Sequence, residues 1–214
     1  MKRVVLDDQQ IQAALLPYDV SADHDLCNDI RIYTETLLRW NEKISLTTVT
    51  DPTEILRLHF GESFFAASVS GIANGRVADI GTGAGFPGIP MRMVRRGLDL
   101  TLVEPIAKRT AFLGEVLRNL TISDATIIRC RMEELPTEAS CFDLIVARAL
   151  GRYDRLLRWS ETRISRNGSI MLLLGESDTE HISKDQNWVW CQPKRIPQSK
   201  GRFILIGSLQ TMKS

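Results

Sequence analysis

The chain has 214 residues, of which 43% are hydrophobic and 25% are charged, and its formal net charge is +1. This size allows one substantial hydrophobic core with a small addition, and hardly two full domains. No apolar run is long enough to span a membrane, and Asp7 and Asp8 interrupt the first segment before a signal-peptide core can form. The four cysteines stand far apart and show no zinc-binding or disulfide pattern. We therefore expect a cytoplasmic globular protein without a bound metal, with four reduced and mostly buried thiols.

Basic side chains concentrate in the last third of the chain. Residues 141–214 carry 12 basic and seven acidic side chains, in contrast to the acidic start of the sequence. Arg148, Arg152 and Arg155 follow one another at helical spacing, which would place them on one side of a helix start. Such a series is typical of a solvated helix face with ion pairs or of a surface that binds RNA. Charge alone favours the solvated face.

The first predicted elements are helices. Apolar residues at helical spacing from Leu26 to Trp40 predict an amphipathic helix of about four turns. Further along, Asp51 is a typical N-cap residue before Pro52, and Glu54 is placed to complete a capping box. We expect a second helix to begin there and to continue through the phenylalanine-rich segment that follows.

The segment VADIGTGAGFPG, residues 77–88, combines an apolar run, an acidic residue and three glycines. Glycine accepts positive φ and has no Cβ, so the backbone at Gly81, Gly83 and Gly85 can approach a ligand closely. The helix that follows offers free N–H groups and a positive dipole end. The spacing GxGxG differs from the GxGxxG that packs a helix under a pyrophosphate. It favours a nucleotide-like ligand without phosphates, such as S-adenosylmethionine, and the alternative is a tight connection that binds nothing.

A second acidic residue strengthens the ligand hypothesis. After a helix expected over residues 89–96, an apolar strand at residues 100–103 ends in Glu104. This carboxylate comes about 20 residues after the glycines, at the strand tip from which nucleotide-binding sheets hydrogen-bond both ribose hydroxyls. The two features together indicate a nucleoside-binding site.

The remaining segments alternate between helix and strand patterns. The expected elements are a helix over residues 107–120, strands over 125–129 and 142–147, a helix over 152–164, and strands over 169–174, 188–191 and 202–208. This alternation predicts a parallel sheet with helices on both faces. The last two strands follow one another without a helix, so we expect an antiparallel pair at one edge. We further expect residues 1–70 to form a helical extension packed on a core of residues 71–214.

Several segments, taken in order, resemble those of one bacterial family. They are ISLT at 44–47 with Asp51-Pro52, HFGES at 59–63, DIGTGAGFPGIP at 79–90, KRTAFL at 108–113, RMEE at 131–134 and ARA at 147–149. From about residue 36 to the strand at 202–204, the chain is similar to the small-subunit ribosomal RNA guanine-N7 methyltransferases, also known as glucose-inhibited division protein B. The resemblance implies an α/β fold of the Rossmann-like class I methyltransferase type. That fold has a mostly parallel seven-stranded sheet, helices on both faces and a short helical N-terminal extension.

The resemblance also implies which residues bind the family's cofactor, S-adenosylmethionine. They are Gly81, Gly83, Gly85, Phe86, Glu104, Met132, Glu133 and Arg148. The glycine backbone would pass under the methionine part, Glu104 would accept from the ribose hydroxyls, and Met132 and Glu133 would lie beside the adenine. Arg148 would pair with the cofactor carboxylate or an RNA phosphate, and not with guanine N7, because methylation makes that ring positive. The alternative is that Phe86 and Met132 are core residues and Glu133 a solvated carboxylate.

The implied reaction needs no catalytic residue. Guanine N7 has an in-plane lone pair and no proton, so it can attack the methyl group without a general base, and positioning supplies most of the rate. The substrate would be a guanine of 16S ribosomal RNA, within a small ribosomal subunit or an assembly intermediate, and we expect a monomer with no membrane or metal partner. The alternatives are a methyltransferase that acts on a protein or a small molecule, and a non-catalytic protein that binds S-adenosylmethionine or RNA.

Three positions depart from the family pattern. Ser45 stands where asparagine is usual, and Glu104 stands where aspartate is commoner; both keep a hydrogen-bonding group. Leu174 stands where the family typically has a lysine, which removes a basic side chain near the implied site. If that lysine contacts RNA, another cation has to replace it, and Arg152 and Arg202 are the candidates.

Overall fold

The strands form one mixed sheet in a computed structural model that describes residues 6–136 and 141–210. Their order is β3-β2-β1-β4-β5-β8-β6, and β7 pairs with β8. The strands are β1 (Asn74–Ile80), β2 (Gly97–Val103), β3 (Ala125–Ile128), β4 (Phe142–Arg148), β5 (Ile164–Gly175), β6 (Trp188–Trp190), β7 (Lys194–Arg195) and β8 (Arg202–Leu209). The first five strands are parallel to one another, whereas β8 is antiparallel to both β5 and β6. The predicted sheet is confirmed, with the two-residue β7 in addition to the seven expected strands.

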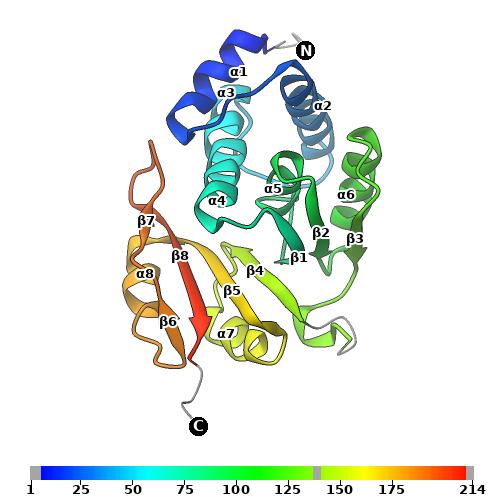
Figure 1. Ribbon diagram of the computed structural model, residues 1–214. Helices are drawn as coiled ribbons and strands as arrows, with labels where there is room; N and C mark the ends of the chain where they lie inside the picture. The colour runs from blue at the N-terminus through cyan, green and yellow to red at the C-terminus, as the bar shows by residue number, and fades with distance from the viewer. Residues whose placement is uncertain (1–5, 137–140, 211–214) are drawn as a thin grey trace.

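Helices cover both faces of the sheet (Figure 1). They are α1 (Asp8–Leu15), α2 (His24–Asn41), α3 (Pro52–Ile55), α4 (Glu62–Ser70), α5 (Gly88–Val94), α6 (Ala107–Asn119), α7 (Tyr153–Glu161) and α8 (Glu176–Ile182), with the shorter turns η1 (Leu16–Tyr18), η2 (Leu56–Gly61) and η3 (Met132–Glu134). The helices from α1 to α6 share the larger hydrophobic core with one face, and α7, α8 and η3 share a smaller core with the other. Within the described ranges, no helix is both long and apolar enough to cross a membrane.

The helices before the sheet begin largely where the sequence predicts. The side chain of Asp23 caps α2 by accepting from the Leu26 N–H at 2.8 Å. Asp51 caps α3 in the same way, accepting from the Glu54 N–H at 2.9 Å. The expected capping box is wrong, because the Glu54 carboxylate pairs with Arg57 at 2.5 Å, one turn further along. The helix then continues through the π-helical turn η2 into α4.

Two helices do not appear among the predicted elements. The side chain of Asp7 caps α1, accepting from the Gln10 N–H at 2.8 Å, and Ile11 packs in the core. The other, α8, buries Thr179 and Ile182 in an otherwise polar sequence, so it carries almost no helical hydrophobic pattern. The division of the chain at residue 70 stays a prediction.

The prediction of mostly buried thiols is wrong. Cys27 is buried and Cys130 is half-buried, whereas Cys141 and Cys191 are exposed. All four are free thiols. Cys141 directly precedes β4 and Cys191 directly follows β6, so both lie at strand ends, where the sheet meets solvent.

Candidate active site

The loop between β1 and α5 has the conformation that its glycines predict. Gly81, Gly83 and Gly85 all have positive φ, at +67°, +58° and +87°. Asp79, at the end of β1, holds both ends of this loop: its Oδ2 accepts from the Thr82 hydroxyl at 2.7 Å and from the Gly88 N–H at 2.8 Å. The strand, the turn and the helix start are therefore confirmed as one rigid unit.

Aromatic rings support the glycine loop from the side of the N-terminal helices. Phe86 is buried and stacks on Tyr33, with ring centroids 5.1 Å apart and planes 6° apart. The ring centroid of His59 lies 4.8 Å from that of Phe86. The Tyr33 hydroxyl donates to the Ala84 carbonyl at 2.5 Å. The structure thus places Phe86 inside an aromatic cluster that fixes the loop, and Tyr33 of α2 is a contributor that sequence reasoning missed.

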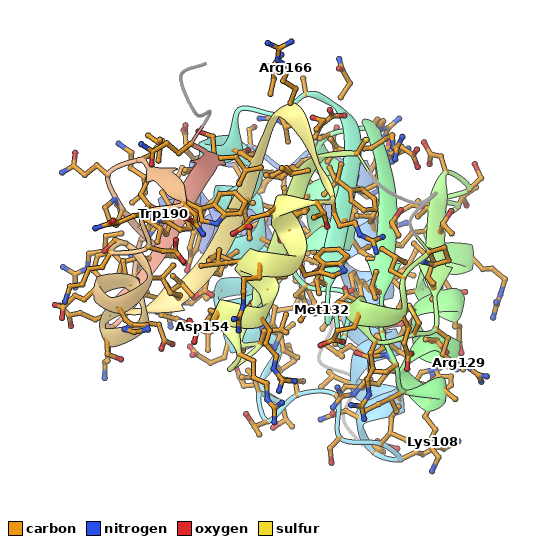
Figure 2. The ribbon with its side chains drawn as sticks, turned by 90° about the horizontal axis from the view of Figure 1, so that it is seen from below. Lys108, Arg129, Met132, Asp154, Arg166 and Trp190 are labelled. Carbon is orange, nitrogen blue, oxygen red and sulfur yellow. The ribbon has the colours of Figure 1, made fainter. Side chains whose placement is uncertain are left out.

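A pocket of about 270 Å³ opens where β1 and β2 end, on the side of η3 and α7. It is lined by Ile80, Gly81, Val103, Pro105, Cys130, Arg131, Met132, Glu133, Leu150, Arg152 and Arg155. Three of the expected site residues, Gly81, Met132 and Glu133, therefore come together around one cavity. Figure 2 shows Met132 near the middle of the view from below, beside helix α7.

Glu104 connects the glycine loop to the end of β2. Its side chain is 2% exposed, Oε2 accepts from the Gly83 N–H at 3.0 Å, and Oε1 accepts from the Ile106 N–H at 2.9 Å. Arg109 lies 3.7 Å from Oε2. Each carboxylate oxygen can accept more than one hydrogen bond, so Glu104 retains acceptor capacity, although it does not itself line the pocket that its neighbours Val103 and Pro105 line.

Arg148 lies apart from Arg152 and Arg155, contrary to the expectation that the three share one side. Arg148 still belongs to β4, and the chain turns through positive φ at Ala149 and Gly151 before α7 begins. Its side chain therefore points to the face covered by α4, where Nη2 donates to the Leu58 carbonyl at 3.0 Å.

A buried carboxylate joins Arg148 to Arg202. Glu62 is 1% exposed; its Oε2 lies 3.4 Å from Arg148 Nη2, and its Oε1 lies 2.5 Å from Arg202 Nη2. Burial raises the pKa of Glu62, against the opposing effect of the two guanidinium groups. Two cations share one carboxylate, so the cluster carries a net positive charge beside the glycine loop.

Four buried polar atoms in this region have no hydrogen-bond partner within the described part of the chain: His59 Nδ1, Glu62 Oε1, Asp79 Oδ1 and Arg148 Nη1. Glu62 Oε1 is ion-paired with Arg202, and of the others Arg148 Nη1 is a donor and Asp79 Oδ1 can act as an acceptor. An unpaired buried polar group costs free energy unless a ligand or water satisfies it. The unpaired donor of Arg148 and the unpaired acceptor of Asp79 are therefore candidates for contacts with a ligand or with water.

His59 and Asp79 should give the unfolding free energy opposite dependences on pH. Burial and the charge of Arg148 lower the pKa of His59 from 6.5 to about 4, so unfolding takes up a proton between these values and stability rises with pH there. Burial raises the pKa of Asp79 from 3.8 to about 6, so unfolding releases a proton between these values and stability falls with pH there.

Variants separate the two contributions. As the pH rises through the window of Asp79, the free energy of unfolding of Asp79→Asn relative to wild type should increase by as much as about 3 kcal/mol. As the pH rises through the window of His59, the free energy of unfolding of His59→Gln relative to wild type should decrease by as much as about 3 kcal/mol. Urea unfolding at a series of pH values measures the difference. Equal pH slopes in wild type and both variants would contradict the assignment.

Comparisons with known proteins agree with this geometry. The family model GidB, described as rRNA small subunit methyltransferase G, matches residues 26–202. The ribosomal RNA small subunit methyltransferase G of Desulfitobacterium hafniense (strain Y51) is 32% identical over 171 residues, which cover 78% of this chain and 71% of that protein. The protein with the same name from Xanthomonas campestris pv. campestris (strain B100) is 34% identical over 181 residues, which cover 79% of this chain and 84% of that protein.

Solved structures show the same fold at low sequence identity. A putative O-methyltransferase from Klebsiella pneumoniae has a TM-score of 0.64 at 16% identity, covering 94% of this chain and 96% of that chain. A ribosomal protein L11 methylase from Lactobacillus delbrueckii subsp. bulgaricus has a TM-score of 0.61 at 15% identity, and the match covers 72% of this chain and 79% of that chain. The predicted Rossmann-like methyltransferase fold is confirmed. With a family model that matches most of its length, the chain belongs to the rRNA small subunit methyltransferase G family of methyltransferases.

Proposed function

We propose that this enzyme transfers a methyl group from S-adenosylmethionine to N7 of a guanine in 16S ribosomal RNA. Family membership supports the reaction class, and the glycine loop with its adjoining pocket supports the nucleoside cofactor. We also propose that the enzyme acts as a cytoplasmic monomer on a small ribosomal subunit or an assembly intermediate.

The residues at the end of the sheet fit the charges of S-adenosylmethionine. Its methionine end carries a carboxylate and an ammonium group, and the unpartnered atoms are a guanidinium donor on Arg148 and a carboxylate acceptor on Asp79. The ionised form of Asp79 also suits a cationic sulfonium. We propose that Arg148 holds the cofactor carboxylate and that Asp79 faces its amino group.

The nucleoside end would occupy the pocket beside Gly81. There Met132 offers a soft apolar surface to the adenine, and Glu133 offers a hydrogen-bonding edge. Glu104 would accept from the ribose hydroxyls while it continues to hold the Gly83 N–H. Gly83 would leave the backbone open to the donor, whereas Gly85 packs closely against Tyr33 and Ile89, and Phe86 would fix the loop from behind.

The chain's contribution to the reaction is positioning. The cofactor supplies an electrophilic methyl group on a positively charged sulfur. The N7 lone pair forms the new N–C bond as the C–S bond breaks, so the positive charge moves to the base and no proton is transferred. Aligned reactants can gain about 7 to 11 kcal/mol in this way. The ion pairs of Arg148 and Arg202 with Glu62 keep these cations away from the base, where they would oppose the developing charge.

Mapping methylated guanines in ribosomal RNA tests the proposal. A strain without this gene should lose one N7-methylguanine in 16S RNA, and expression of the gene should restore it. An unchanged methylation pattern would overturn the assignment. Incubation with labelled S-adenosylmethionine and small ribosomal subunits separates the alternatives: label in RNA supports the proposal, label in protein or small molecules supports another methyltransferase, and binding without transfer supports a non-catalytic protein.

A further inference from the structure

Three arginines stand at the mouth of the pocket beside Gly81. Arg131 directly precedes η3, and Arg152 and Arg155 belong to the start of α7, so two separate segments bring them to one opening. All three residues are exposed and line the pocket. We call this set the arginine rim.

The arginine rim has no carboxylate partner within ion-pair distance among residues 6–136 and 141–210. Its acidic neighbours are engaged elsewhere or left in solvent. The Glu134 carboxylate accepts from the Arg131 backbone N–H at 3.0 Å, and Asp154 lies 4.0 Å from His181 of α8. Glu133 is exposed and lines the same pocket. The solvated face that the sequence favours therefore forms at Arg152 and Arg155, but no ion pair joins either arginine to a carboxylate of the described residues.

The proposed cofactor does not account for these cations. The adenosine end of S-adenosylmethionine, which would occupy this pocket, carries no negative charge. Its anionic group is the carboxylate at the other end, where Arg148 has a free donor on the opposite side of the sheet. A sulfonium donor is itself cationic, so three additional guanidinium groups beside it would weaken its binding unless an anion screens them.

The fold does not account for these cations either. Arg152 is the N-cap residue of α7, its side chain makes no capping hydrogen bond, and Arg155 lies in the first turn. Cations at a helix N-terminus oppose the helix dipole, and like charges three residues apart repel each other. An acidic or hydroxyl side chain would suit both positions better. The two arginines therefore reduce the stability of the free protein.

We propose that the arginine rim binds backbone phosphates of the substrate RNA on either side of the target nucleotide. The inference rests on the proposed function and names the surface on which the RNA would lie beside the cofactor pocket. Guanidinium groups bind phosphate oxygens through paired hydrogen bonds, and such contacts orient a nucleic acid without reading its sequence. The bound phosphates would add to the negative charge of Asp154 at the start of α7 and offset the two arginines there.

The test compares two double variants that each remove two positive charges. Arg152→Ala with Arg155→Ala alters the arginine rim. Arg158→Ala with Arg166→Ala is the matched control, because both side chains are exposed and neither lines the pocket. Figure 2 shows Arg166 at the top edge of the view, away from the pocket residue Met132 near the middle. The probe is 16S ribosomal RNA in small subunits, with affinity measured between 50 and about 200 mM salt.

The arginine-rim variant should bind the subunits roughly tenfold more weakly, with a salt slope reduced by about 0.7 for each lost contact to a single strand. Its thermal midpoint should equal or exceed that of wild type, and its affinity for S-adenosylmethionine should not fall. If the two double variants had equal RNA affinity and equal salt slopes, the arginine rim would not bind RNA phosphates, and the proposed function would remain intact. Wild-type protein that neither binds nor methylates the RNA would overturn both proposals.

Discussion

Replacing Glu62 by glutamine should lower the free energy of unfolding by about 3 kcal/mol. The carboxylate is almost completely buried between Arg148 and Arg202, and glutamine keeps its shape while removing its charge. The guanidinium groups of Arg148 and Arg202, whose side chains are 18% and 33% exposed, would then repel each other with no carboxylate between them. Breaking a buried ion pair from one side is costly for this reason, whereas removing both charges is not. Urea unfolding of the two proteins measures the change.

The neighbouring turn of the same helical segment provides the control. Glu54→Gln removes the same charge from an ion pair with Arg57 whose two side chains are 43% and 32% exposed, so it should cost less than about 1 kcal/mol. Adding Arg202→Gln to the Glu62 variant should recover part of the lost stability, because the excess positive charge falls by one. A Glu62 variant as stable as the Glu54 variant would mean that the cluster is fully solvated.

The local parts of the site follow from the sequence. An apolar run, an acid and three glycines predict β1, the loop and α5, because strand periodicity and positive φ are properties of neighbouring residues. Glu104 is predictable for the same reason, as the residue that follows the next apolar strand. Met132 and Glu133 carry no such local pattern. The structure shows both residues lining the pocket, but from the sequence only the family resemblance predicts them as site residues.

The long-range parts of the site do not follow from any local pattern. Tyr33 donates to Ala84 across 51 positions of the chain, and nothing in the helical pattern of α2 distinguishes this tyrosine from an ordinary core residue. Glu62 and Arg202 meet because β8 inserts beside β5, an arrangement that an antiparallel edge pair does not specify. A carboxylate among the phenylalanines of α4 is the signal that could have indicated Glu62, since unpaired buried carboxylates are rare.

The three arginines after β4 show how a correct spacing can give a wrong geometry. Helical spacing holds for Arg152 and Arg155, which share the start of α7. Arg148 precedes the turn, and strand alternation sends its side chain to the other face of the sheet. The difference separates two tasks: a cation beside Asp79 that suits the methionine end of the cofactor, and exposed cations at the pocket mouth that suit RNA.

Substitutions at two glycines of the same loop should destabilise the fold to different extents. Gly85→Ala should destabilise the fold by about 3 kcal/mol, because its φ of +87° disfavours any Cβ and the new atom would overlap the Tyr33 hydroxyl and Ile89. At Gly83 the nearest atom to an added Cβ is the Gly81 carbonyl oxygen at 3.9 Å, and aspartate tolerates a φ of +58°. Gly83→Asp should therefore cost about 1 kcal/mol of stability.

Cofactor binding should be more sensitive than stability to the substitution at Gly83. Gly83→Asp places a second carboxylate beside Glu104, on the surface where the donor would lie, so affinity for S-adenosylmethionine should fall about tenfold or more by calorimetry. Gly151→Ala is a matched control, because Gly151 also has positive φ and its added Cβ would meet no atom within 4 Å. It should share the modest stability cost of Gly83→Asp and keep its cofactor affinity. If Gly83→Asp bound the cofactor as tightly as Gly151→Ala, the donor would have to lie somewhere other than on this loop, since a ligand in van der Waals contact with Gly83 cannot ignore the added side chain.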